Sequence, residues 1–255
     1  MPASFKPPSV AGLSRRSFCG ALAGVLALPA TQALAQTECA VFTPERQSAV
    51  APAEAIAMLK AGNARFTSGQ SINCDLMEQV RETADHQSPF AAIVGCIDSR
   101  VPPELVFDQR LGDVFCARVA GNFVNVDILG SLEYATAVAG ARAIVVLGHS
   151  SCGAIKSAVD GVEMGNITAL LHNLAPAMAT IGPADGPRSS SNHELVQKVA
   201  EENVRLTAAG LAERSPIIGK LVEAGELTIV PAMHDGLVNY SDFSGFLHCL
   251  DADTG

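Results

Sequence analysis

Tryptophan is absent from this chain, and aromatic residues make up only 5% of its 255 positions. The core must therefore be filled mainly by Ala, Val, Leu and Ile. Basic residues are also scarce: the longest basic run is Arg15-Arg16, and the formal net charge is −9. A nucleic-acid partner is therefore not expected. No Gly-x-Gly-x-x-Gly follows the first predicted strand, which disfavours a dinucleotide-dependent oxidoreductase.

Residues 1–35 have the pattern of an export signal that is cleaved from the mature protein. Three basic residues precede an apolar stretch at 21–28, and Ala33-Leu34-Ala35 supplies the small residues of a cleavage site before Gln36. The apolar stretch is too short to remain as a membrane-spanning helix. Arg15-Arg16 resembles a twin-arginine (Tat) signal, with an ordinary secretory signal as the alternative. We therefore expect a periplasmic protein without membrane association, whose net charge moves from −9 to −12 when the three basic residues are removed.

Alternating strand and helix patterns predict an α/β fold with a mostly parallel β-sheet flanked by helices. Residues 90–95 and 143–147 are apolar without alternation, which is typical of strands covered on both faces. Further strands are predicted at 113–120 and, as the last one, at 227–230. The predicted helices are 52–66, 75–84, a short one near 101–104, 127–139 with Asp127 as N-cap, 154–159, 167–181, 192–212 and one opened by Ser215-Pro216.

The chain is long enough for one large α/β domain or two small ones. No internal repeat is visible, and we predict a single catalytic domain at 53–250, preceded by an extended N-terminal arm at 36–52. Gly, Pro and Ser dominate residues 182–191, which predicts a mobile loop there.

Two short polar stretches follow the first and third predicted strands. They are Cys96-Ile97-Asp98-Ser99-Arg100 and His149-Ser150-Ser151-Cys152. Ligands of such sheets bind at the carboxyl ends of the strands, so we expect the two stretches to meet. Cys96, His149 and Cys152 offer two thiolates and one imidazole, a set that suits Zn²⁺. Three protein ligands leave a fourth position for water, as in a catalytic zinc site.

Asp98 and Arg100 supply the groups that such a site needs beside its ligands. A zinc-bound water has its pKa lowered to about 7, and Asp98 can accept a hydrogen bond from it and orient it. Arg100 can hold the Asp98 carboxylate in a bidentate pair and keep it ionised. Alternatively, Asp98 could become the fourth zinc ligand, which would close the site.

Further motifs accompany these two stretches in order along the chain: Gly62–Phe66, Gly112–Asn122, Ser131–Ala135 and Val146–His149. Together they resemble the motifs of the β-class carbonic anhydrases. The resemblance implies reversible hydration of CO₂ to bicarbonate and a proton by zinc-bound hydroxide, with one Zn²⁺ per subunit and Asp98–Arg100 as the catalytic dyad.

The resemblance also implies a homodimer, often paired into a homotetramer, and an apolar substrate pocket lined by Phe115 and Tyr134. Some members of the family have a Trp three residues before the first cysteine, where it helps to form a noncatalytic bicarbonate site. Ile93 occupies that position here, so this form of regulation is not expected.

Two alternatives stay open at this point. One is hydrolysis of COS or CS₂ at the same site. The other is a non-catalytic binding protein that keeps zinc for stability, against which the presence of Asp98, Arg100, Phe115 and Tyr134 argues.

The remaining cysteines and histidines support fewer inferences. Cys116 lies in an alternating apolar run and is predicted to be a small core residue. Cys39 and Cys249 lie near the two ends of the mature chain and could form a disulfide, although sequence does not fix the connectivity. Surface or capping roles are expected for the other histidines, which are His86, His172, His193, His234 and His248.

Overall fold

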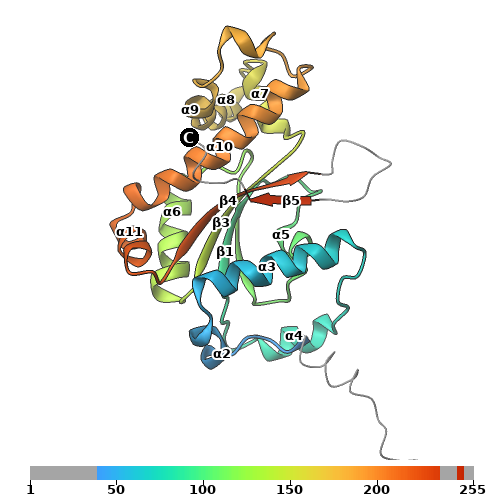
Figure 1. The fold of residues 1–255 in the computed structure, drawn as a ribbon, viewed down its shortest axis with the longest axis vertical. Coiled ribbons are helices and arrows are strands. Elements are labelled where there is room, and N and C mark those ends of the chain that lie inside the picture. Colours follow the sequence, from blue (N-terminus) through green and yellow to red (C-terminus); the bar gives the residue numbers. More distant parts are fainter. Residues whose placement is uncertain (1–38, 236–245, 250–255) are drawn as a thin grey trace, which may run out of the picture. The chain divides into compact units, whose positions relative to one another are not determined.

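A five-stranded sheet forms the centre of the fold (Figure 1). The structure, a computed structural model, describes residues 39–235 and the backbone of 246–249; the predicted signal at 1–35 lies outside the described residues. The strands are β1 (Ala91–Gly95), β2 (Val114–Arg118), β3 (Ala143–His149), β4 (Thr228–Asp235) and β5 (Phe246–Cys249). They lie in the order β2-β1-β3-β4-β5, the first four in parallel and β5 antiparallel to β4. The predicted α/β class with a mostly parallel sheet is therefore confirmed.

Ten α-helices are found in the described part of the chain. They are α2 (Pro44–Ala49), α3 (Pro52–Thr67), α4 (Leu76–Glu82), α5 (Pro103–Val106), α6 (Val126–Glu133), α7 (Gly153–Val159), α8 (Gly165–Leu171), α9 (Ala175–Met178), α10 (His193–Arg214) and α11 (Pro216–Glu223). None of them is long and apolar enough to cross a bilayer.

Helices cover both faces of the sheet, which explains why β1 and β3 are apolar throughout. On one face, Ile93 and Val145 belong to a core that includes Leu59 of α3. On the other face, Val94 and Val146 belong to a core that includes buried residues of α7 and α10. The two cores cover the faces of β1 and β3, and polar side chains gather where these strands end.

The start of α6 differs from the prediction. Asn125, not Asp127, is the N-cap, and its side chain accepts a hydrogen bond from the Ile128 amide at 3.0 Å. The helix then continues as a π-helical turn over Tyr134–Val138. Asn is as good a cap as Asp, so the helix can begin two residues earlier than predicted.

The helix predicted over 167–181 is divided into pieces. A 3₁₀ turn at His172–Leu174 separates α8 from α9, and Pro176 lies in the first turn of α9. Proline has no amide hydrogen to continue the helical ladder, which accounts for the interruption. By contrast, α11 begins as predicted, because Ser215 caps it by accepting from the Ile218 amide.

The segment predicted as an extended arm contains α2, which is anchored to the domain. Gln47 is buried, and its Nε2 donates to the carbonyls of Pro89 and Ala139, both at 2.6 Å. The suggested Cys39–Cys249 disulfide is wrong, because Cys39 is bonded to Cys74. Which cysteine pairs with Cys39 depends on the path of the chain around α3, and the spacing of cysteines in the sequence does not reveal that path.

The loop at 182–191 is tied at several points rather than free. The Ser190 amide donates to Asp160 at 2.7 Å, and Lys198 of α10 pairs with Asp185 at 2.5 Å. The strand predicted as the last one, at 227–230, is β4, which extends to Asp235 and is followed by β5.

The buried carboxyl group of Asp113, just before β2, should make the stability of the fold depend on pH. Its Oδ2 accepts from the Arg110 amide, whereas its buried Oδ1 has no partner among the described residues. Burial raises the pKa of Asp113 to about 6. The folded state therefore holds this proton more tightly than the unfolded state, and wild-type stability falls by roughly 3 kcal/mol between about pH 4 and pH 6.

Asp113→Asn cannot ionise, so this part of the fall should be missing. Urea denaturation of both proteins at pH 4.5 and pH 7 measures the effect. We expect the free energy of unfolding of the variant, relative to that of the wild type, to be higher at pH 7 than at pH 4.5. An unchanged difference at the two pH values would show that Asp113 does not titrate in this range.

Candidate metal centre

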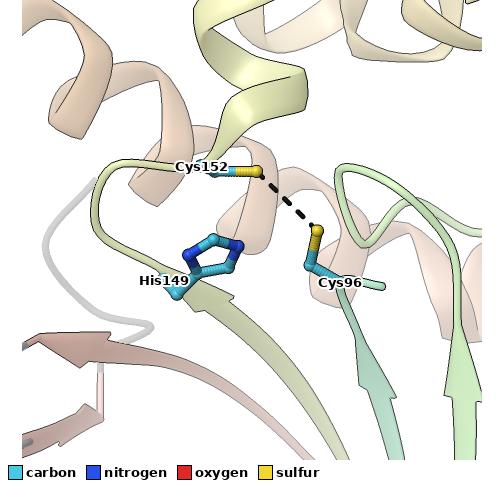
Figure 2. A group of neighbouring side chains, drawn as sticks. All are labelled: Cys96, His149 and Cys152. Carbon is cyan, nitrogen blue, oxygen red and sulfur yellow. Dashed lines mark hydrogen bonds between the residues drawn. The ribbon is translucent and has the colours of Figure 1, made fainter. Parts of the chain in front are cut away.

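Three side chains suited to a metal meet at the carboxyl ends of β1 and β3. Cys96 follows β1, His149 is the last residue of β3, and Cys152 directly precedes α7. Because β1 and β3 pair in parallel, both strands end at the same edge. The ligand atoms of the three buried residues lie within 4.8 Å of one another, and Figure 2 shows them facing a common point. The cluster is able to bind a metal ion.

The two sulfurs have the spacing of ligands on one zinc ion. Cys96 Sγ and Cys152 Sγ are 3.9 Å apart. Two sulfurs bound to a tetrahedral zinc at about 2.3 Å would lie about 3.8 Å apart. The hydrogen bond between the thiols lowers the pKa of Cys96 and raises the pKa of Cys152. This geometry fits zinc without movement of either side chain.

His149 presents a free nitrogen to the same place. Its Nδ1 lies 2.9 Å from the Ser150 carbonyl, which can only accept, so Nδ1 carries the hydrogen and donates it. Nε2 then holds a lone pair, and it is buried without a hydrogen-bond partner among the described residues. A buried nitrogen left in this state is costly unless something binds it, and a backbone-oriented imidazole is the usual form of a metal ligand.

Asp98 and Arg100 form the pair that the sequence suggested. Arg100 donates from Nε to Asp98 Oδ1 at 2.9 Å and from Nη2 to Oδ2 at 2.7 Å. This bidentate pair holds the pKa of Asp98 well below its usual range. Asp98 Oδ2 also lies 3.9 Å from His149 Nε2, so the carboxylate stands beside the cluster. In this arrangement Asp98 is bonded to Arg100; to become a fourth ligand it would have to exchange those bonds.

Arg118 and Gly121 also act on the site, although the sequence did not single them out. Arg118, at the carboxyl end of β2, donates to the carbonyls of Cys96 and Asp98 at 2.8 and 2.6 Å. The Gly121 amide donates to Cys96 Sγ at 3.4 Å. Arg118 could have been found from the sequence, because it is a charged residue at the end of the predicted strand 113–120.

Phe115 and Tyr134 lie together in one cavity. Both line a cavity of about 640 Å³ bounded by β1, β2, α6 and the π-helical turn. The lining of this cavity includes none of the three cluster residues. The role of Phe115 and Tyr134 in a substrate pocket therefore stays a prediction.

His234 contradicts the expectation of a surface or capping role. It is buried on β4 and lies opposite His149 in the register of β3 and β4. Burial lowers the pKa of His234, and the nearby His149 adds to this effect. His234 is thus a buried neighbour of His149 at the edge of the metal centre.

An α/β sheet with a Cys₂His cluster able to bind a metal and a charged dyad at its carboxyl edge is an arrangement typical of metal-dependent enzymes. Comparison with known proteins identifies the family. Residues 91–237 match the family model described as carbonic anhydrase. The chain therefore belongs to the carbonic anhydrase family.

Individual relatives agree with this assignment. The chain is 36% identical over 191 residues to carbonic anhydrase 2 of Mycobacterium tuberculosis, covering 70% of this chain and 86% of that protein. It is also 36% identical over 185 residues to the carbonic anhydrase of Mycolicibacterium smegmatis, with the same coverage.

Solved structures place the fold in the β-class. The β-carbonic anhydrase CafA of Aspergillus fumigatus matches with a TM-score of 0.60 at 25% identity, over 78% of this chain and 90% of that one. Tetrameric β-carbonic anhydrases of Sordaria macrospora match with a TM-score of 0.59 at 24% identity, over 68% of this chain and 90% of that one.

Proposed function

We propose that the reversible hydration of CO₂ by this carbonic anhydrase depends on one zinc ion per chain, held by Cys96, His149 and Cys152. The observation that carries the assignment is the 3.9 Å separation of the two sulfurs. The unpartnered Nε2 of His149 supports it. The chemistry that a bound zinc ion supplies is Lewis acidity, which makes an ionised water available near neutral pH. Nothing in the cluster favours COS or CS₂ over CO₂.

Asp98 orients the attacking water, and Arg100 positions Asp98. The carboxylate stands beside the cluster and can accept a hydrogen bond from the water. Its low pKa keeps it ionised, so it orients the water without retaining the proton, which passes on to solvent or buffer. Arg100 occupies both carboxylate oxygens and limits the rotation of the group.

Asp98→Asn tests this role. The amide cannot form the anionic bidentate pair with Arg100, and we expect CO₂ hydration to fall about 10- to 100-fold with zinc content unchanged. Stopped-flow hydration with a pH indicator gives the rate, and metal analysis gives the zinc content.

Asp185→Asn is the matched control. The Asp185 side chain is 17% exposed and pairs with Lys198, whereas Asp98 is 16% exposed and pairs with Arg100. The control should keep the wild-type rate. A zinc-loaded Asp98→Asn enzyme with full activity would remove Asp98 from the mechanism.

A homodimer formed across β2 is the assembly that we propose. Strand β2 is an edge of the sheet, and its residues Val114–Arg118 are only partly buried although four of the five are apolar. An apolar side chain that lines the same cavity as β2 residues also projects there: Val126 is 77% exposed. Edge strands of this kind are normally covered or paired. A second copy on this edge would enclose the cavity that holds Phe115 and Tyr134, as a pocket for an uncharged substrate requires.

Val126→Asp should convert the dimer into a monomer. A two-fold interface would place two new carboxylates in a desolvated patch, which should weaken association at least about 100-fold. Light scattering coupled to size exclusion measures the mass. Met164→Asp, at a side chain that is also exposed, should leave the dimer intact. A dimeric Val126→Asp protein would exclude this face as the interface.

A periplasmic location, reached through the Tat-type signal at 1–35, is the final part of the proposal. The Cys39–Cys74 disulfide supports an oxidising compartment. Export after folding would also let the metal thiols bind zinc before they meet oxidants.

A further inference from the structure

The sulfur of Cys96 accepts a hydrogen bond from a loop that is far from it in sequence. The donor is the amide of Gly121, 3.4 Å from Sγ. Hydrogen bonds to a metal-bound thiolate hold its direction and reduce the charge that it donates to the metal. The position of this amide therefore matters for any ion bound by Cys96.

Gly121 needs outside support to keep its amide in place. Its φ is +84°, a conformation that glycine adopts freely, and a Cβ there would lie only 3.1 Å from Leu174. The following peptide is fixed at both of its polar atoms. The Asn122 amide donates to the Val119 carbonyl at 3.0 Å, and Asn203 Nδ2 donates to the Gly121 carbonyl at 2.9 Å.

Asn203 is an unusual residue for its surroundings. It is 4% exposed and lies on the buried face of α10, between the core residues Val199 and Val204. A buried amide is costly unless it is hydrogen-bonded, and an apolar residue would suit this face better. The bond to Gly121 joins α10 to the loop beside the cluster across 82 residues of sequence.

We propose that Asn203 is a positioning residue of the metal centre: by holding the Gly121 carbonyl, it keeps the Gly121 amide on the sulfur of Cys96. This inference rests on the proposed function, in which Cys96 is a zinc ligand. Asn203 does not touch substrate, and its effect should appear first in how the metal is held.

Asn203→Asp tests the inference with little change of volume. The carboxylate cannot donate to the Gly121 carbonyl. We expect zinc affinity, measured by competition with a chelator, to fall about 10- to 100-fold. In the cobalt(II)-substituted protein, the thiolate-to-metal charge-transfer band should shift, because the sulfur has lost its hydrogen bond. Asn203→Ala removes the donor without adding a charge and should change both readouts in the same direction.

Asn63→Asp is the matched control. Asn63 is 6% exposed, and its Nδ2 donates to the Val106 carbonyl at 2.9 Å, as Asn203 does to Gly121. Its carbonyl partner belongs to α5, and the control should lower stability without altering zinc affinity or the cobalt band.

Wild-type zinc affinity and an unshifted band in both Asn203 variants would overturn the inference, as would an equal loss of affinity in Asn63→Asp. A wild-type protein that binds no zinc would instead overturn the proposed function, so the two failures are distinguishable.

Discussion

Replacing Cys152 by serine is expected to remove zinc from the protein and to reduce CO₂ hydration at least about 10³-fold, out of the more than 10⁶-fold by which enzymes typically accelerate reactions. Serine has nearly the same shape but is a poor ligand for zinc, which prefers thiolates and imidazoles. The variant would leave Cys96 and His149 as the two remaining members of a three-residue cluster. Metal analysis of the purified protein and stopped-flow hydration measure the two effects.

Cys116→Ser separates loss of the metal from loss of a cysteine thiol, since the structure leaves Cys116 half-buried rather than in the core as predicted. Cys116 is also a free cysteine, and it packs against the core on the other face of the sheet. Burial raises the pKa of its thiol, which keeps it neutral and unsuited to bind a metal. The control should keep one zinc per chain and near wild-type activity. A zinc-free Cys116→Ser, or a fully active Cys152→Ser, would contradict the assignment of ligands.

The metal cluster could be predicted because its position depends on where two apolar strands end, which the sequence displays directly. Apolar runs before Cys96 and His149 mark two parallel strands that are covered on both faces, and parallel strands end at a common edge. Two motifs about fifty residues apart in sequence must then meet.

The residues that support the cluster could not be predicted in the same way. Asn203 reaches the centre from the middle of α10, where its position depends on how that helix packs against the sheet. The pairing of Cys39 with Cys74 likewise depends on the path around α3. Tertiary packing decides both.

The largest expected effect on stability comes from the Cys39–Cys74 disulfide. Cys39 precedes α2, and Cys74 follows α3. The bond therefore closes a loop that contains α2 and α3. A bridge across 35 residues restricts the unfolded chain by about 3–4 kcal/mol in the chain-entropy model. For a domain of this size, its loss corresponds to a fall of roughly 10 °C in Tm.

The double variant Cys39→Ser/Cys74→Ser should therefore unfold about 10 °C below the wild type while it keeps its zinc, since neither cysteine belongs to the metal cluster. Thermal unfolding followed by circular dichroism measures the shift, and Cys116→Ser provides a cysteine-to-serine control that retains the bridge. Wild-type protein without residues 1–35, produced in a reducing cytoplasm, should resemble the double variant until it is oxidised. Equal Tm values for the oxidised wild type and the double variant would contradict a stabilising bridge, and a wild type purified from the periplasm with both thiols free would remove the structural support for an oxidising compartment.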